Sequence, residues 1–310
     1  GAALMWALGF DTSNYTTSVA MTDGALWDNR SRLLDVPEGA LGLRQADALF
    51  SHVRRLPELA QALFEGCGEE IGVIGASTRP RAVEGSYMPC FLAGESQARV
   101  IAAALHVPGC TVSHQQGHIA AALRSAGRME LLERPFLCWH LSGGTTELLH
   151  VTPEGWNVHA ERIGGTMDLS AGQLIDRTGR LLGLSFPSGK ALDALAAQGD
   201  SRPFAVRLHG LDFSLSGMQN QVEQMHARGA HPAQTAHFAI ATVCQTVDQA
   251  TRAALALYPG EPVVFSGGVS SNSQLRGWSC GYERVFAAPQ FSTDNALGVA
   301  VLALRWREQA

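Results

Sequence analysis

Paired cysteines, an excess of basic residues and long apolar segments are all absent from this sequence. Six cysteines are scattered without any Cys-x-x-Cys spacing: Cys67, Cys90, Cys110, Cys138, Cys244 and Cys280. Their scatter excludes a zinc ribbon and favours reduced thiols over a disulfide framework. The formal net charge of −5 at pH 7 argues against a protein that binds nucleic acid unaided, because phosphate contacts need Lys and Arg. A partner could still supply the basic surface.

No segment has the pattern of a membrane span or a signal peptide. The apolar run Leu4–Phe10 is short, lacks a basic lead-in and passes directly into Asp11-Thr12-Ser13, which predicts a buried first strand. The 310 residues are 46% hydrophobic and 16% charged, which is typical of a globular protein, and the length favours two lobes. We therefore expect a cytoplasmic protein that does not contact membranes.

A histidine pair stands out among the polar residues that are present. His114 and His118 follow a short apolar run and open the helical stretch Ile119–Leu123. Their i, i+4 spacing puts both imidazoles on one face of a helix, where they can bind the same metal ion. A metal site would need at least one further ligand. The plain alternative is a pair of histidines at a helix start, one capping and one half-buried.

Two stretches of the chain share one plan, which predicts a duplicated architecture. Residues 8–24 and 139–155 each read as an apolar strand, a small polar turn ending in Thr-Thr, a second strand and a further turn. A repeat roughly 130 residues apart suggests two related α/β lobes that face each other across a cleft. Small residues in such turns let backbone N–H groups approach a phosphate, although tight hairpins without a ligand have the same composition.

A third glycine turn follows the apolar strand at residues 263–266. Gly267 and Gly268 lead from this strand into a helix, which is where α/β proteins commonly bind a ligand. Asn272 offers donors and acceptors that suit an adenine or ribose edge. For the two glycines alone, a turn that needs their backbone freedom explains the pattern equally well.

Six motifs occur in the order of a known family. They are Phe10-Asp11-Thr12-Ser13 with Thr17–Ala20, His114-x-x-Gly-His118, Ser142-Gly143-Gly144-Thr145, Phe213-Ser214-x-Ser216-Gly217, Gly267-Gly268-Val269-x-x-Asn272 and Thr293-Asp294-Asn295-Ala296. From about residue 8 onward the chain resembles the tRNA N6-adenosine threonylcarbamoyltransferase family, formerly called O-sialoglycoprotein endopeptidases or M22 peptidases. The resemblance implies an α/β fold of duplicated RNase H-like lobes, of the actin and sugar-kinase type of ATPase, with a ligand cleft between the lobes. We expect lobes at residues 1–108 and 109–295, with a C-terminal helix at 296–310 packing back on the first.

The resemblance also implies the residues of the site. A divalent metal ion, iron or zinc, would be held by His114, His118 and Asp294. Asp11 and Ser142 would be catalytic. An adenine nucleotide or acyl-adenylate would contact His140, Leu141, Ser142, Gly143, Gly144, Asp176, Gly189, Gly268 and Asn272.

The chain departs from the family pattern near the acceptor. Thr145 replaces the His of Ser-Gly-Gly-His-Thr, and Asp11 replaces a first-strand Glu. Residues 79–89 replace a Gly-Pro-Gly-Leu loop, and residues 43–50 replace the Val-Pro-Glu-Leu-Ala-Ser-Arg helix. These departures resemble those of a divergent paralog whose acceptor differs from tRNA.

Three functions fit these residues, and the first is favoured. It is metal-dependent transfer of a threonylcarbamoyl or related carbamoyl group from an acyl-adenylate to an amine, in the family N6 of a tRNA adenosine, with release of AMP. The second is a non-catalytic nucleotide-binding scaffold or regulatory subunit. The third is a metallopeptidase, but Gln115 and Gln116 stand where His-Glu-x-x-His has its general base. Expected partners are the adenylate, tRNA through accessory subunits, and a dimer partner of homologous fold.

Overall fold

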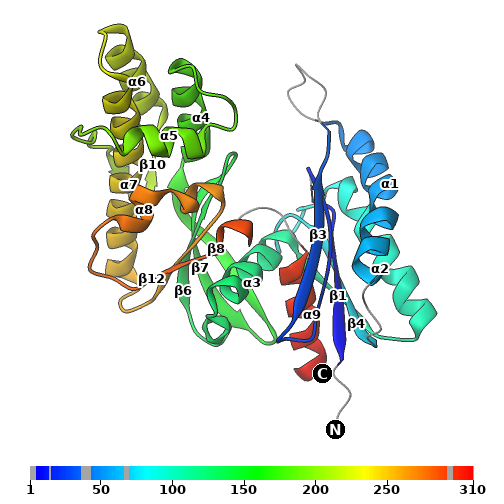
Figure 1. Ribbon diagram of the computed structural model, residues 1–310. Coiled ribbons are helices and arrows are strands. Elements are labelled where there is room, and N and C mark those ends of the chain that lie inside the picture. Colours follow the sequence, from blue (N-terminus) through cyan, green and yellow to red (C-terminus); the bar gives the residue numbers. More distant parts are fainter. Residues whose placement is uncertain (1–4, 14, 36–42, 66–69, 292–295, 310) are drawn as a thin grey trace. The chain divides into compact units, whose positions relative to one another are not determined.

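Two mixed β-sheets with helices packed on them make up the structure, a computed structural model (Figure 1). It describes residues 5–13, 15–35, 43–65, 70–291 and 296–309. The chain divides into two compact units, Gly1–Arg134 with Thr152–Ala160 and Thr293–Ala310, and Pro135–Val151 with Glu161–Ser292. The lobe boundary between residues 108 and 109 stays a prediction.

The first sheet has the strand order β3-β2-β1-β4-β5. Its strands are β1 (Trp6–Asp11), β2 (Thr16–Thr22), β3 (Trp27–Leu33), β4 (Ile71–Arg79) and β5 (Gly109–Ser113). The helices of this unit are α1 (Gln45–Phe64), η1 (Pro89–Phe91), α2 (Leu92–Leu105), α3 (His114–Ala126), η2 (Met129–Glu133) and α9 (Leu297–Gln309).

The second sheet has the strand order β12-β11-β6-β7-β8-β10-β9. Its strands are β6 (Phe136–Leu141), β7 (Thr146–Glu154), β8 (Asn157–Thr166), β9 (Leu208–His209), β10 (Asp212–Phe213), β11 (Val263–Ser266) and β12 (Arg284–Phe286). The helices that follow these strands are α4 (Ala171–Leu181), α5 (Gly189–Ala196), α6 (Ser216–Ala227), α7 (Pro232–Leu257), η3 (Gly268–Ser271), α8 (Ser273–Gly277) and η4 (Pro289–Phe291).

Strand pairing confirms the predicted duplication. In the first sheet β1 runs antiparallel to β2 and parallel to β4. In the second, β6 runs antiparallel to β7 and parallel to β11. The order 3-2-1-4-5 of the first sheet recurs as β8-β7-β6-β11-β12, and β10 and β9 extend the second sheet beyond β8. The α/β fold of two repeats predicted from the sequence is therefore correct.

Side-chain size decides which helix covers which face of the first sheet. Large apolar residues such as Leu8 and Phe10 alternate along β1 with Ala7 and Gly9. The large ones form a core with α1 and α2, whereas the small ones face α9 (Figure 1). A β-carbon at Gly9 would lie 2.6 Å from the backbone nitrogen of Ala300, so α9 approaches β1 closely because Gly9 has no side chain.

The second unit has a larger core. It gathers Trp139 of β6, Phe265 of β11 and Phe213 of β10 under α7. The indole of Trp139 is buried, and its Nε1 donates to Thr251 Oγ1 on α7 at 2.8 Å, so this large side chain leaves no polar atom unpaired in the core. None of the helices in the described ranges is both long and apolar enough to span a membrane.

Helices α3 and α9 cross at a pair of glycines, and this crossing holds the histidine-bearing helix. A β-carbon at Gly298 would lie 1.7 Å from the carbonyl oxygen of Gly117. We predict that Gly298→Ala lowers the free energy of unfolding by about 1–3 kcal/mol or more, because α3 must move away. Urea denaturation measures the change. Gly217→Ala on α6 is the control, since nothing lies within 4 Å of its added methyl group; equal midpoints for the two variants would contradict the prediction.

His52 on α1 makes the fold sensitive to acid. Burial lowers the pKa of His52 from 6.5 to about 4, Asp11 opposes this shift and Arg55 adds to it. Its Nδ1 lies 2.8 Å from Thr17 Oγ1, and among the described residues its Nε2 has no hydrogen-bond partner.

As the pH falls, His52 is protonated near pH 6.5 in the unfolded chain but only near pH 4 in the folded chain. The free energy of unfolding therefore decreases by about 3 kcal/mol between pH 6.5 and 4 because of this group. We predict that His52→Gln flattens this part of the stability–pH curve, measured by urea denaturation at each pH. His226→Gln, at an exposed position on α6, should leave the slope unchanged. An identical slope in wild type and His52→Gln would refute this assignment.

Candidate functional site

Helix α3 begins at His114 because Ser113 caps it. Ser113 Oγ accepts from the Gln116 amide at 3.2 Å, and Gln116 Oε1 accepts from the Ser113 amide at 2.8 Å, which forms a capping box. His114 is thus the first helical residue, and His118 lies one turn later on the same face. The two rings meet edge to face with centroids 4.3 Å apart. Neither histidine serves as the cap, which belongs to Ser113.

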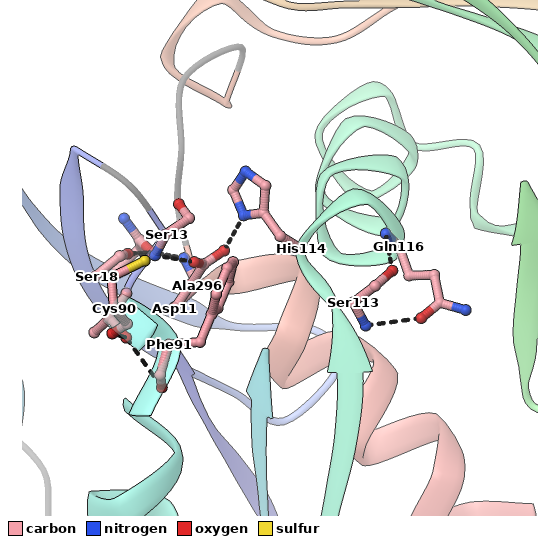
Figure 2. A network of polar contacts seen from close by, with 11 residues as sticks. Asp11, Ser13, Ser18, Cys90, Phe91, Ser113, His114, Gln116 and Ala296 are labelled. Carbon is pink, nitrogen blue, oxygen red and sulfur yellow. Dashed lines mark hydrogen bonds and ion pairs between the residues drawn. The ribbon is translucent and has the colours of Figure 1, made fainter. Parts of the chain in front are cut away.

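Asp11, at the end of β1, touches the first of these histidines (Figure 2). Its Oδ2 lies 2.6 Å from His114 Nδ1, and its Oδ1 accepts from the Ser13 amide at 2.9 Å. The residue is only 1% exposed. Both oxygens of this buried carboxylate are therefore engaged, one of them by a histidine that was predicted to bind metal.

The donor atoms present suit a metal that binds imidazole. Two adjacent histidines, one backed by a carboxylate, have the arrangement that proteins use to orient metal ligands. Across the described ranges, no group of three or more His, Cys, Asp and Glu is placed to hold a metal ion. Asp294, the predicted third ligand, lies outside the described residues. At Ala296 the backbone amide donates to Ser18 Oγ and Asn29 Oδ1, which anchors the start of α9 on β2 and β3.

The β6–β7 turn carries the predicted phosphate contacts. Ser142 and Thr145 close it, since the Ser142 amide donates to the Thr145 carbonyl and the Thr145 amide donates to Ser142 Oγ at 3.0 Å. A β-carbon at Gly143 or Gly144 would have no neighbour within 4 Å. Each of these two glycines therefore leaves room on the side where a side chain would stand. Leu141 is fully buried, so toward a ligand it can present backbone alone.

The first turn of α4 packs against this glycine turn. Ser170 caps the helix, and its hydroxyl also donates to the Gly143 carbonyl at 2.8 Å. A β-carbon at Gly172 would lie 2.4 Å from the Ser142 carbonyl oxygen, so the helix end and the turn can meet only through glycine. The amide-rich N-terminus of an 11-residue helix therefore lies beside the predicted phosphate turn.

Asp176, in the middle of α4, holds the start of the next helix. Its Oδ1 accepts from the Ser188 amide at 2.8 Å, one residue before Gly189 opens α5. A β-carbon at Gly189 would meet nothing within 4 Å. The nucleotide contacts of Asp176 and Gly189 stay predictions, but the structure brings these two predicted residues together.

Asn272 has structural partners that the sequence did not reveal. Its Oδ1 caps α8 by accepting from the Leu275 amide at 3.0 Å, and its Nδ2 donates to Asp193 Oδ1 on α5 at 2.9 Å. Asp193 also accepts from the amide and the hydroxyl of Ser273. Asp193 thus ties α5 to α8. The sequence offered one sign of this role, since Asp193 lies one helical turn after Gly189. A carboxylate on a helix usually faces solvent, however, so Asp193 was not predicted.

The two glycines after β11 serve different purposes. Gly267 has φ = +89°, and a β-carbon there would lie 2.2 Å from the Leu141 carbonyl oxygen, so the turn itself requires glycine. A β-carbon at Gly268 would have no neighbour within 4 Å. On the strand beside this turn, His140 Nδ1 lies 3.4 Å from Ser266 Oγ. The β6–β7 turn therefore packs closely against two other segments through their glycines, Gly172 of α4 and Gly267 after β11.

Asp168 contacts the Phe213-Ser214-x-Ser216-Gly217 motif. It accepts from the hydroxyls of Ser214 and Ser216 and from the Leu215 amide, which fixes the start of α6. Burial alone would raise the pKa of the Asp168 carboxyl, but these hydroxyl and amide donors hold it well below its ordinary range. Nothing local in the sequence indicated that Asp168 would contact this motif, because the two lie 46 residues apart.

Comparison with known proteins gives one consistent family. A family model described as tRNA N6-adenosine threonylcarbamoyltransferase matches residues 46–301. Proteins of that description from Thiobacillus denitrificans and Granulibacter bethesdensis are each 31% identical to this chain. The matches cover 96% and 94% of this chain, and 89% and 86% of the relatives.

Solved structures of low sequence identity share the fold. Full-length HypF in its phosphate- and nucleotide-bound form has a TM-score of 0.61 at 15% identity, over 99% of this chain and 46% of that one, so this chain spans about half the length of HypF. A ROK family glucokinase from Streptomyces griseus in complex with glucose and AMPPNP has a TM-score of 0.52 at 13% identity, over 96% and 99% of the two chains. These likenesses confirm the predicted fold of the actin and sugar-kinase type.

The histidine pair generates a direct prediction about metal. We predict that His118→Ala loses bound metal, because one of two adjacent imidazole donors is removed. Elemental analysis of the purified protein after loading with zinc measures the content. His226→Ala, on the exposed face of α6, is the matched control and should retain the wild-type stoichiometry. Equal zinc content in wild type and His118→Ala would show that His118 is not a ligand of the metal.

Proposed function

Because this chain belongs to the tRNA N6-adenosine threonylcarbamoyltransferase family, we propose that it transfers a threonylcarbamoyl or related carbamoyl group from an acyl-adenylate to an amine, in the family the N6 of a tRNA adenosine. The amine nitrogen would form a bond to the carbamoyl carbon as the bond from that carbon to the phosphate oxygen breaks. AMP then leaves, and the amine proton passes to water. The observation that carries the proposal is the adjacent histidine pair with its buried carboxylate, within a chain of this family.

The proposal assigns the metal to the first unit. His114 and His118, with Asp294 as the third ligand, would hold iron or zinc. When bound, this ion supplies a Lewis acid that polarises a phosphate or carbonyl oxygen of the substrate. His114 is held by Asp11, so its ring does not have to reorient when substrate arrives. A metal ligand that is already in position can help to stabilise the charge that develops during the transfer, and such a transfer needs no covalent nucleophile.

The proposal assigns the adenylate to the second unit. At each of four glycines a β-carbon would meet nothing within 4 Å, and this room beside the backbone supports contact with phosphate and nucleoside; they are Gly143, Gly144, Gly189 and Gly268. Asp176 would accept from ribose hydroxyls, and Asn272 would present the rest of its amide to the base. Two further residues would contact the adenylate, Ser142 and His140. The Ser142 Oγ accepts from the Thr145 amide, and its hydroxyl proton can be donated to a substrate oxygen. His140 lies near the end of β6, just before this turn.

The acceptor is the part of the proposal that depends on partners. A net charge of −5 disfavours unaided tRNA binding. The loop that replaces the family's Gly-Pro-Gly-Leu segment is anchored beside the site, because the Gln115 amide donates to the Pro80 carbonyl at 3.0 Å. Arg79 and Arg81 flank that carbonyl and suit an anionic acceptor or partner surface. Accessory subunits, among them a partner of homologous fold, would bring tRNA to the site in the cytoplasm.

A peptidase mechanism has little support in this geometry. Gln115 stands where the His-Glu-x-x-His motif has its general base, and the next residue, Gln116, has both ends of its side chain engaged. Its Oε1 accepts from the Ser113 amide, and its Nε2 donates to the Val158 carbonyl at 2.7 Å. An amide cannot take up a proton from water, so neither Gln115 nor Gln116 can serve as that base. The side chain of Gln116 instead stabilises the start of α3 through the capping box.

The proposal predicts that chemistry and acceptor binding separate experimentally. Metal-loaded protein given synthetic threonylcarbamoyl-adenylate should release AMP, and modified tRNA should form only when the family's accessory subunits are added. His118→Ala should reduce AMP release by at least about 100-fold if the metal supplies several kcal/mol, whereas His226→Ala should behave as wild type. AMP is quantified by chromatography and the modified nucleoside by mass spectrometry.

Two outcomes would contradict the proposal. Robust tRNA modification by the protein alone would refute its dependence on partners. An absence of AMP release under every combination of tRNA and subunits would favour the non-catalytic nucleotide-binding scaffold.

A further inference from the structure

Asp11 is oriented more completely than its place at a strand end requires. The residue terminates β1, and its register partner on β2 is Ser18. Its Oδ1 accepts from the Ser13 amide two residues later, which fixes the rotation of the carboxylate. The other oxygen, Oδ2, then lies 2.6 Å from His114 Nδ1 on α3 (Figure 2). A local turn therefore aims one carboxylate oxygen at a single nitrogen of a distant histidine.

The chemistry of this contact defines where the imidazole proton lies. A carboxylate oxygen can only accept a hydrogen bond, so His114 Nδ1 must be the donor. A neutral imidazole has one N–H, and its other nitrogen, Nε2, then carries the lone pair. Metal ions bind the nitrogen with the lone pair. The carboxylate thus selects the tautomer, and so decides which nitrogen of His114 faces a metal.

We propose that Asp11 is a positioning residue, which holds His114 as the Nδ1–H tautomer with Nε2 presented as the metal-binding atom. This inference rests on the proposed function, because it concerns the same metal. It gives Asp11 a role through another residue and not through contact with the substrate. The energetic benefit is that a pre-oriented ligand loses little conformational freedom on binding metal.

Two other contacts hold the same ring. The ring centroid of Phe91 lies 6.2 Å from that of His114, edge-on, and His118 packs against it from a third side at 4.3 Å. Together with Asp11 they restrict both the tilt of the ring and its rotation. Within the described residues no Lys or Arg forms an ion pair with Asp11, so its buried carboxylate is stabilised by hydrogen bonds from the His114 ring and the Ser13 amide.

The chain contains a matched carboxylate–histidine pair far from this site in sequence. Glu261 Oε1 lies 3.2 Å from His150 Nε2, and Tyr258 stacks on the His150 ring at 4.0 Å. Here the carboxylate faces Nε2, so the same reasoning gives the opposite tautomer. Glu261→Ala therefore removes an equivalent interaction without touching His114, which makes it a suitable control for Asp11→Ala.

The tautomer is measured first, in metal-free protein at pH 8, from the nitrogen-15 chemical shifts of the histidine rings. Wild type should show His114 as Nδ1–H. Asp11→Ala should move His114 toward the Nε2–H form that an unpartnered imidazole prefers in water. Glu261→Ala should change His150 and leave His114 as in wild type. An unchanged Nδ1–H signal for His114 in Asp11→Ala would overturn the proposal.

Zinc affinity is measured second, by competition with a chromogenic chelator. Loss of an outer-shell partner typically weakens metal binding by about 10–100-fold, and Asp11→Ala should fall in this range while Glu261→Ala stays within about twofold of wild type. Equal zinc affinity in wild type and Asp11→Ala would overturn the proposal. Asp11→Asn keeps the side-chain shape and supplies the same comparison if the alanine variant does not fold.

The two measurements separate this inference from the proposed function. If wild-type protein binds no zinc, the metal assignment in the proposed function fails, while the tautomer of His114 in metal-free protein still tests the role of Asp11. If wild type binds zinc but Asp11→Ala changes neither tautomer nor affinity, the metal assignment stands and Asp11 has no positioning role.

Discussion

The buried hydrogen bond between Asp11 and His114 is the contact on which the candidate metal site of the first unit depends. It requires the end of β1 and the start of α3 to meet within hydrogen-bonding distance. β1 is fixed at the centre of its sheet between β2 and β4, and α3 is held by its capping box and by its glycine crossing with α9. Because glycine at 117 and 298 lets the two helices touch, the histidines are placed by packing of rigid elements and not by a loop.

The duplicated plan gives its two halves different chemistry at equivalent positions. At the end of the first repeat's central strand stands Asp11, which faces a histidine. At the end of the second repeat's central strand stands Leu141, whose side chain is buried while its carbonyl packs against Gly267. The turn after Leu141 offers glycine backbone beside a helix N-terminus. One repeat therefore supplies side chains suited to a metal, and the other supplies backbone suited to a phosphate.

Local patterns predicted two α/β lobes, their repeat and the helix that carries His114 and His118, because spacing and turn residues are local properties. The actin and sugar-kinase type of fold came from the family resemblance. The contacts that orient the site were not predictable in this way. Asp11 and His114 are 103 residues apart, Asp193 and Asn272 are 79 apart, and Asp168 and Ser214 are 46 apart. Such pairs follow from how strands and helices pack, which the sequence pattern of either partner does not encode. Asp176 and Asn272 also have structural partners at Ser188 and Asp193, which their family motifs did not reveal.

We propose that His114 and His118 together bind one metal ion. X-ray absorption spectroscopy of the zinc-loaded protein tests it most directly, since imidazole ligands give a characteristic multiple-scattering pattern. We expect two imidazole nitrogens at about 2.0–2.1 Å from the zinc, with oxygen in the remaining positions. A first shell containing sulfur at about 2.3 Å, or oxygen without imidazole scattering, would contradict it.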